Sequence, residues 1–571
     1  MFTIGRISIF LAVVAAAQVA CATGAPGAQP AQGGAAPVAS ATRTLVVAAR
    51  YEPDGLPQRS PREGQINVKI LKRAVNAELA SLDDRGEARP YLAETLPQLG
   101  TDTWRVLPDG RMETSYRLKP NLTWHDGAPL TADDYVMAFR IFATPALGLA
   151  ASAPFRSIEN VHAPDPRTVV IRWKQLYPDV TFTTYREFTP MPKHILEELF
   201  AADQGELFAN DSYWNREFIG AGPYKLDRWE PGAFIEMSAF DGHALGKPKI
   251  DRLRFAFIAD QSAAMAHMLS GEMHLSDGSA IGGVEALLLK KEWDATRSGD
   301  MLFVPAQWRA SHFQLRSDIS TPAAISDARV RKALAHAVDK HLFNQVLYAD
   351  LDFTTDTFIA KTSTYGELAD RAIVKYPLDL RRTESLMAEA GYARGTDGMY
   401  ISPTAGRFVG DAKTNSGRDN ELETSVLASM WRQVGFEFGE SVLTVADSQD
   451  AEVRASYPSV FTTSMTQGET AMVGITSDGI PTAQNRWRGN NRGSWSNPEY
   501  DRLVTQLEST LDAAQRGQLV AQIARVHSED LPAISLFFRP LPYAYTSAVR
   551  GIGMVPPEGN VAWNIHDWEL R

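Results

Sequence analysis

The amino-terminal stretch constrains this chain more than any other part, because it confines folding to the residues that follow. Arg6 precedes an apolar segment, residues 9–20, that reads IFLAVVAAAQVA. The segment is too short to span a bilayer as a mature helix but matches the apolar region of a secretory signal peptide. Residues 22–41 carry no charge and, apart from Val38, no large apolar side chain, so they cannot fold on their own. We predict a signal peptide over residues 1–21, a flexible linker over residues 22–43 and a folded body from residue 44.

Cys21 is the only cysteine of the sequence and directly follows the apolar segment. Its position resembles the lipobox of bacterial lipoproteins, in which the cysteine becomes lipid-modified and begins the mature chain. Gln18 departs from the Leu that is usual three residues earlier. The alternative is cleavage elsewhere, as in a plain signal peptide, with loss of Cys21. Either way the body has no thiol, which excludes disulfides, thiolate metal sites and cysteine nucleophiles.

Charge and length narrow the class of protein. The chain has 57 Lys and Arg against 68 Asp and Glu, a net charge of −11. Affinity for nucleic acid comes chiefly from cations that neutralise phosphates, so we do not expect a nucleic-acid partner. A length of 571 residues predicts two to four domains.

Strand-like and helix-like segments alternate along the body. Alternating or β-rich runs predict strands at residues 44–49, 112–120, 168–173 and 249–258. Helical spacing begins at residue 261, and residues 326–347 predict one long amphipathic helix that Ser326 can cap. This interleaving predicts mixed α/β domains.

Residues 123–142, TWHDGAPLTADDYVMAFRIF, resemble an active site because His125 and three carboxylates lie close in sequence. Thr131, however, stands three residues before Asp134, which is the spacing of a helix capping box. Asp133 and Asp134 would then occupy the first helical turn, where the helix dipole favours negative charge. We interpret the stretch as scaffold.

Other motifs also favour structural roles. GAGPYK, residues 220–225, lacks the Lys-Ser/Thr pair of a phosphate-binding loop, so we interpret it as a tight turn that feeds a strand. HExxH, GxSxG and EF-hand patterns do not occur, and the histidines, among them His312, His336 and His341, lack metal-ligand spacing. We therefore expect no catalytic residue, no metal and no cofactor.

The segment RWRGNNRGSW, residues 486–495, combines three Arg and two Asn with flanking Trp in a loop. One interpretation is a solvated Arg-rich surface loop. The other is a set of donors aimed into a cleft.

Taken in order, several segments resemble the extracellular solute-binding proteins of peptide and nickel ABC transporters, of the large three-domain type. The resemblance covers about residues 44–571. It rests on residues 116–139, 220–232, 247–274, 325–340, 384–400, 495–504 and 530–538.

The resemblance implies a two-lobed, periplasmic-binding-protein-like α/β fold with a two-stranded hinge and an extra inserted α/β domain. Lobe one would comprise residues 44–70, 206–305 and 539–571, the inserted domain residues 71–205, and lobe two residues 306–538. Ligand would bind between the lobes, and hinge closure would present it to a permease.

The implied function is that of a receptor, not an enzyme, which serves an ABC permease with its ATPase. The chain would be a monomer in the periplasm or on the outer face of the cell membrane, anchored there by a lipid on Cys21. A receptor for a sensory system has the same sequence features. A secreted hydrolase would need a nucleophile–base pair or a metal site, and neither is visible.

The resemblance also implies a ligand site, lined by Tyr51, Glu52, Gln307, Trp308, Arg309, Thr414, Asn415, Ser464, Gln467, Arg486, Trp487, Asn490 and Asn491. Peptide-binding members commonly carry an Asp-Tyr in lobe two whose Asp pairs with the amino terminus of the peptide. Residues 460–474, VFTTSMTQGETAMVG, contain none. Because the site is rich in Arg and amide donors, we predict a polar ligand with an acidic or hydroxyl-rich group, such as a modified peptide, an opine or an oligosaccharide.

Overall fold

The structure is a computed structural model that describes residues 43–61, 68–148, 150, 154–181, 188–349, 351–555 and 559–571. Arg43–Arg571 form one compact unit. The predicted signal peptide, Cys21 and the linker up to residue 42 lie outside the described residues. No helix within the described ranges combines the length and the apolar character that crossing a membrane needs.

Ten strands form the main sheet, in the order β17-β16-β18-β12-β19-β11-β1-β10-β9-β8. Parallel pairs join β1 to β10 and β11, and β16 to β17 and β18, whereas the other neighbours are antiparallel. The predicted α/β class is thereby confirmed. The strands are β1 (Thr44–Ala49), β8 (Tyr224–Glu230), β9 (Phe234–Ala239), β10 (Arg252–Phe257), β11 (Leu275–Ser276), β12 (Gly299–Phe313), β16 (Val409–Asn415), β17 (Glu437–Leu443), β18 (Val460–Met465) and β19 (Ala533–Thr546).

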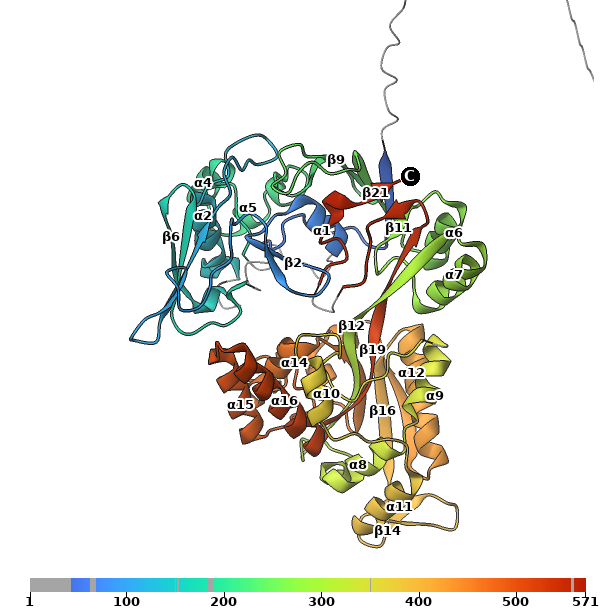
Figure 1. Ribbon diagram of the computed structural model, residues 1–571. Coiled ribbons are helices and arrows are strands. Elements are labelled where there is room, and N and C mark those ends of the chain that lie inside the picture. Colours follow the sequence, from blue (N-terminus) through green and yellow to red (C-terminus); the bar gives the residue numbers. More distant parts are fainter. Residues whose placement is uncertain are drawn as a thin grey trace, which may run out of the picture. The chain divides into compact units, whose positions relative to one another are not determined.

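Two long antiparallel strands, β12 and β19, connect the two ends of this sheet. They pair from Gly299 with Thr546 to His312 with Ala533. At one end β19 also pairs with β11, and β1, β10, β9 and β8 follow in the sheet. We call these five strands, β11, β1, β10, β9 and β8, the first strand group. At the other end β12 pairs with β18, next to β16 and β17, and these three strands are the second strand group. Figure 1 shows β12 and β19 running side by side between the two groups.

A separate four-stranded sheet, in the order β4-β5-β7-β6, lies between β1 and β8 in the sequence. It consists of β4 (Trp104–Val106), β5 (Met112–Arg117), β7 (Thr168–Trp173) and β6 (Ile158–Asp165), with helices α2 (Asp133–Phe142) and α4 (Lys193–Ala202) nearby in sequence. Trp173 and Tyr135 belong to the same apolar core as Leu45 of β1. Two further cores draw their fully buried residues from between Trp308 and Phe538. The division into two lobes and an inserted domain, with the boundaries given above, stays a prediction.

The remaining elements are short strands and helices. The strands are β2 (Ala80–Leu82), β3 (Ala88–Pro90), β13 (Ala393–Arg394), β14 (Tyr400–Ser402), β15 (Gly406–Arg407), β20 (Val549–Arg550) and β21 (Glu569–Leu570). The helices are α1 (Lys69–Val75), α5 (Glu206–Ala209), α6 (Gln261–Ser270), α7 (Gly283–Thr296), α8 (Ala328–His336), α9 (Lys340–Tyr348), α10 (Gly366–Ala372), α11 (Leu380–Glu389), α12 (Arg418–Gln433), α13 (Ala451–Ala455), α14 (Gly468–Gly474), α15 (Pro498–Ser509) and α16 (Ala513–Asp530).

One predicted helix is wrong. Residues 326–347 form two helices, α8 and α9, and not one. Asp327, not Ser326, caps α8, because its carboxylate accepts a hydrogen bond from the Arg329 N–H. Asp339 caps α9 in the same way by accepting from the Leu342 N–H. A capping carboxylate in the middle of an amphipathic pattern thus ends one helix and starts the next.

The stretch that resembles an active site is held inside the fold by hydrogen bonds. The buried carboxylate of Asp134 accepts from the backbone N–H groups of Thr131 and Lys193, both at 2.8 Å, and from Trp124 Nε1 at 3.3 Å. The acidic half of the predicted capping box therefore forms. The hydroxyl half does not, because α2 begins at Asp133, after Ala132, and no side chain of the described chain caps it.

His125 fixes this stretch to the GAGPYK turn. Its Nδ1 accepts from the Gly220 N–H at 3.2 Å, and its Nε2 lies 3.0 Å from the Gly222 carbonyl oxygen, to which it donates. These bonds define the neutral tautomer with the proton on Nε2. A Cβ on Gly220 would lie 2.1 Å from the Val75 carbonyl oxygen, so the turn requires glycine there. The prediction that both segments are structural is confirmed.

Replacing His125 should reduce the acid sensitivity of the fold. Burial lowers the pKa of His125 from 6.5 to about 4. A lowered folded-state pKa stabilises the fold fully above pH 6.5, and the contribution is lost as the pH falls towards about 4. In His125→Gln, which keeps a donor and an acceptor, about 3 kcal/mol of this pH dependence should disappear.

The measurement is urea unfolding of both proteins between pH 7.5 and pH 4.5. A His341→Gln variant, in which the replaced side chain is exposed, serves as the control and should follow the wild type. Equal pH slopes for His125→Gln and the wild type would contradict the assignment.

Candidate functional site

The site starts from an irregularity in the middle of β12 and β19. Pro305 pairs with Pro540, but Gln307 pairs with Arg539, so Ala306 is an extra residue in β12. Arg309 pairs with Phe537 and Ala310 with Ser535, so Leu536 is an extra residue in β19. Between these two register shifts lies a block of three pairs, residues 307–309 against 537–539, which we call the joint.

Gln467 satisfies backbone groups that the joint leaves open. Neither Pro305 nor Pro540 has a backbone N–H, so this pair cannot close a normal ladder. The Gln467 Nε2 donates to the carbonyl oxygens of Pro305 and Ala306, each at 3.1 Å. A side chain that follows β18 thus replaces a missing strand partner.

A buried ion cluster stands on one face of the joint. The guanidinium groups of Arg309 and Arg539 donate to opposite oxygens of Glu423 on α12, in each case at 2.5 Å. Asn420, one helical turn earlier, accepts from both Arg309 and Arg539, at 3.0 Å and 2.9 Å. Arg309 also reaches the Ser464 hydroxyl of β18 at 3.4 Å.

The charges of this cluster do not balance. Two guanidinium groups share one buried carboxylate, which leaves one positive charge in excess. Burial lowers the pKa of Arg309, although Glu423 opposes this. For Arg539 burial also acts to lower the pKa, but Glu423, Tyr348 and Asp419 together outweigh it and the pKa rises. Both guanidinium groups stay charged at any physiological pH, so the excess persists.

Two buried polar atoms at the joint have no hydrogen-bond partner in the described chain: Arg539 Nε and Gln467 Oε1. Buried polar groups without partners are rare and call for an explanation. Arg539 and Gln467 flank the joint from β19 and from the segment after β18. Asn415 Oδ1 also lacks a partner in the described chain, but Thr414 pairs with Thr462 on the face of Arg309, so Asn415 takes the other face of the sheet.

Seven of the residues predicted from the resemblance lie on β12, β16, β18 or shortly after β18: Gln307, Trp308, Arg309, Thr414, Asn415, Ser464 and Gln467. Gln307 is exposed. Thr414 is fully buried, and its hydroxyl donates to the Thr462 carbonyl oxygen at 3.1 Å. The structure therefore brings these residues to neighbouring strands, with Thr414 and Asn415 on β16, one strand further from the joint than β18.

Trp308 alternates with Arg309 along β12, so its side chain takes the opposite face of the sheet. It is fully buried, its Nε1 donates to the Ser535 hydroxyl at 3.1 Å, and its ring meets Phe358 and His527 edge to face. It packs in the core.

The other predicted residues lie elsewhere. Tyr51 is 43% exposed, and Glu52 accepts from Trp229 Nε1 at 2.5 Å and from the Gly232 N–H at 2.9 Å, near the turn between β8 and β9. Both follow β1, in the first strand group.

The predicted loop is attached beyond the far end of β12. The Leu315 N–H donates to the Gly493 carbonyl oxygen at 2.8 Å, and the Trp487 ring lies 5.5 Å from the Arg316 guanidinium. Asn491 is buried and donates to three backbone carbonyl oxygens of the loop region. Arg486 and Asn490 are exposed.

Sequence reasoning missed Glu423, Asn420 and Arg539. Glu423 shares the buried face of α12 with Leu427 and Trp431. An acidic residue at the helical spacing of the apolar residues is expected to be buried, and a buried carboxylate needs a cation as its partner. The sequence contained this signal. Arg539 follows the apolar run DLPAISLFF, where a charge that interrupts a buried strand gives a similar signal.

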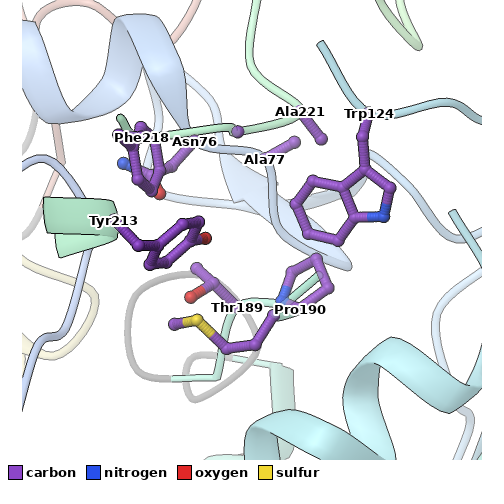
Figure 2. A pocket seen from close by; sticks show the side chains of 10 residues that line it. Asn76, Ala77, Trp124, Thr189, Pro190, Tyr213, Phe218 and Ala221 are labelled. Atoms are coloured by element: carbon purple, nitrogen blue, oxygen red, sulfur yellow. The ribbon is translucent and has the colours of Figure 1, made fainter. Parts of the chain in front are cut away.

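The described residues form no cluster of metal ligands, and two of their cavities are small. No group of three or more His, Cys, Asp or Glu within the described residues could hold a metal ion. Figure 2 shows a cavity lined by Trp124, Thr189 and Ala221, among others. Its volume is about 10 Å³, and a cavity beside His312 has the same volume. Each has room for one water at most.

Comparison with known proteins identifies relatives. Residues 94–482 match the family described as bacterial extracellular solute-binding proteins, family 5 Middle. An ABC transporter peptide-binding protein of Brucella ovis is 26% identical over 297 residues, 51% of this chain and 51% of the relative. The match thus spans about half the length of that relative.

Two longer matches cover most of the chain. The oligopeptide-binding protein AppA of Bacillus subtilis is 23% identical over 498 residues, 86% of this chain and 85% of the relative. The crystal structure of NikZ from Campylobacter jejuni in complex with Ni(L-His) has a TM-score of 0.71 and 21% identity, and the alignment covers 92% of this chain and 99% of NikZ. At that identity the likeness extends to the fold.

Neutralising Glu423 should destabilise the protein strongly. Glu423→Gln removes the carboxylate and leaves the buried guanidinium of Arg309 and the partly buried one of Arg539 uncompensated, which should lower the free energy of unfolding by about 3 kcal/mol or more. Equilibrium unfolding in urea measures the change. Glu421→Gln, on the exposed face of the same helix, should change it by less than about 0.5 kcal/mol. A loss in Glu423→Gln no larger than in this control would show that the cluster contributes nothing.

Proposed function

The chain belongs to the bacterial extracellular solute-binding proteins of family 5, and from that premise we propose that it is the receptor of an ABC importer. It captures a peptide-like or other polar small solute between the two strand groups. Closure of the two groups on the solute then allows delivery to a membrane permease with its ATPase.

The joint is the observation that carries this proposal. Two strands connect the two groups, and their ladder is interrupted by two prolines and two register shifts. Interruptions of this kind weaken the ladder locally, as a hinge requires. Polar side chains with unused hydrogen-bonding atoms surround the same place. A bound solute that uses these atoms would favour the closed arrangement, because ligand shifts an equilibrium towards the form that it binds better.

Ion pairs join helices that follow the second strand group to the region of the four-stranded sheet. Arg516 of α16 donates to Glu469 and, at 3.3 Å, to Asp179, which follows β7 in the sequence. Burial raises the pKa of Asp179, and Arg516 opposes this. Arg156 and Glu508 approach to 3.5 Å. The Arg516–Asp179 and Arg156–Glu508 contacts would support a closed arrangement, because separation of the two sides would break them.

The solute class is proposed from the residues and the relatives together. The Brucella and Bacillus relatives are named as peptide-binding and oligopeptide-binding proteins, and NikZ was crystallised with a nickel–histidine complex. The joint offers a donor on Arg539, with an acceptor on Gln467 beside it, which suits a solute with both acidic and N–H or O–H groups. Tyr51, Arg486, Trp487 and Asn490 are further proposed contacts, since each keeps exposed surface.

The decisive experiment identifies a solute and follows closure. The natively purified protein is denatured and the eluate analysed by mass spectrometry, after which the refolded protein is titrated with the identified compound by calorimetry. We expect one solute per chain. Because the body lacks cysteine, spin labels on Cys21→Ala protein with Leu207→Cys and Arg381→Cys report the distance between the two sides, which should shorten on binding.

Two results would contradict the receptor function. One is an eluate without any solute, together with no binding of candidate peptides, opines or oligosaccharides. The other is turnover of the added compound, which would favour a hydrolase. A sensory role would give the same binding and closure, and pull-down of a sensor instead of a permease would identify it.

We also propose that the mature chain is anchored through a lipid on Cys21, outside the described residues. Cys21→Ala should move the protein from the membrane fraction to the soluble fraction, because no other lipid attachment site is proposed. Immunoblots of fractionated cells measure this. Ser40→Ala, in the linker, is the control and should stay with the membrane. Unchanged fractionation of Cys21→Ala would reject the anchor.

A further inference from the structure

The excess positive charge at the joint lacks a buried counter-charge in the described chain. Glu423 is the one buried carboxylate that contacts Arg309 and Arg539, and its side chain is 1% exposed. Asp419 is the nearest further acid that influences Arg539, but it is exposed on the first turn of α12. Water screens an exposed charge strongly, so Asp419 compensates the cluster weakly.

The two arginines differ in how they can be reached. The Arg309 side chain is 2% exposed, whereas that of Arg539 is 27% exposed. Arg309 has hydrogen bonds from Nε, Nη1 and Nη2. Arg539 uses Nη2 for Glu423 and Asn420, while its buried Nε has no partner. Arg539 is therefore the side from which an anion can approach.

The unpaired acceptor of Gln467 narrows the chemical class of the solute further. Gln467 holds the carbonyl oxygens of Pro305 and Ala306, which are next to Gln307, the strand partner of Arg539. Its Oε1 has no partner in the described chain and can accept a hydrogen bond. A solute at this place thus meets a cationic donor beside a neutral acceptor.

We propose that the solute carries a carboxylate that binds Arg539 at the joint, with a neighbouring N–H or O–H group that donates to Gln467. This assignment rests on the proposed function for the identity of the site as a solute site. One carboxylate supplies the single negative charge that the cluster lacks, whereas a phosphate monoester would bring nearly two. Arg donates to carboxylate oxygens with strong, charge-assisted hydrogen bonds.

The position of Arg539 at the joint relates the binding of the solute carboxylate to closure of the two strand groups. Arg539 lies in β19 between the two strand groups, and its carboxylate partner Glu423 belongs to α12, beside the second group. A solute carboxylate on Arg539 therefore binds at the place about which the groups move. Because the Arg539 side chain is only 27% exposed, water screens this charge incompletely, and a neutral analogue should lose most of the affinity.

The first arm of the test uses acetate as the probe and needs no natural solute. Thermal unfolding of the full chain is followed with increasing sodium acetate against sodium chloride at equal ionic strength and pH 7. In the wild type, acetate should raise the Tm in a saturable manner beyond chloride. In Arg539→Gln the apparent acetate affinity should fall about tenfold or more. This variant keeps the pair of Arg309 with Glu423, so it should still fold.

Two further variants sharpen this arm. Arg418→Gln removes an exposed arginine of α12, the helix that carries Glu423, and should respond to acetate as the wild type does. Arg539→Lys keeps the charge without the planar fork and should show intermediate affinity. Equal effects of acetate and chloride on the wild type, or an undiminished acetate response in Arg539→Gln, would overturn the carboxylate site.

The second arm separates this inference from the receptor function. The solute released from the natively purified protein is identified by mass spectrometry. A released solute without a carboxylate overturns the inference and leaves the receptor function intact. A saturable acetate site in a protein that releases and binds no solute keeps the anion site but removes the receptor function. A released carboxylate whose affinity falls about tenfold in Arg539→Gln supports both.

Discussion

The pairing of β12 with β19 is the interaction on which the rest of this structure depends. These two strands are the ones that belong to both halves of the ten-stranded sheet. Their ends are fixed by further strands, β11 on one side and β18 on the other. Between these contacts Pro305 faces Pro540, and neither donates a backbone hydrogen bond. This interruption of the ladder lies beside the cluster of Arg309, Glu423 and Arg539.

The cluster of Arg309, Glu423 and Arg539 explains how a charged group can stand there. An isolated buried charge is costly, and the cost is offset only when hydrogen bonds saturate it. Glu423 uses both carboxylate oxygens and Asn420 adds a second acceptor. The arrangement saturates Arg309 and leaves Arg539 incompletely satisfied. In the proposed site Arg309 would thus have a structural role and Arg539 a binding role, although the two side chains are chemically identical.

Local patterns in the sequence located the regular elements well. Residues 44–49 and 168–173 form β1 and β7 with the predicted bounds, because alternation and β-branched content act locally. The helix over residues 326–347 failed for an equally local reason, since the capping role of Asp339 outweighs the apolar periodicity around it. His125 could be recognised as a poor catalytic candidate, but its partners Gly220 and Gly222 could not be derived from spacing.

The site was harder to predict, because its contacts span large distances in the sequence. Arg309 and Glu423 are 114 residues apart, and Glu423 and Arg539 are 116 apart. A resemblance can suggest that Arg309 and Ser464 lie near a ligand. It cannot show that the hydrogen bonds of Arg309 are already used within the protein, whereas Arg539 Nε has no partner in the described chain. It also placed Trp308 there, whereas the pleat of β12 turns Trp308 to the other face.

The two register shifts of the joint have a consequence for how such a chain can vary over evolution. Because side chains of a strand alternate between faces, one extra residue exchanges the faces of everything beyond it. Ala306 makes that exchange in β12 and Leu536 reverses it in β19. Only the three residue pairs between these two positions have a register that differs by one residue from the pairs on either side. A lineage can therefore replace side chains at this place one at a time, but it can change the length of either strand there only if the other changes with it.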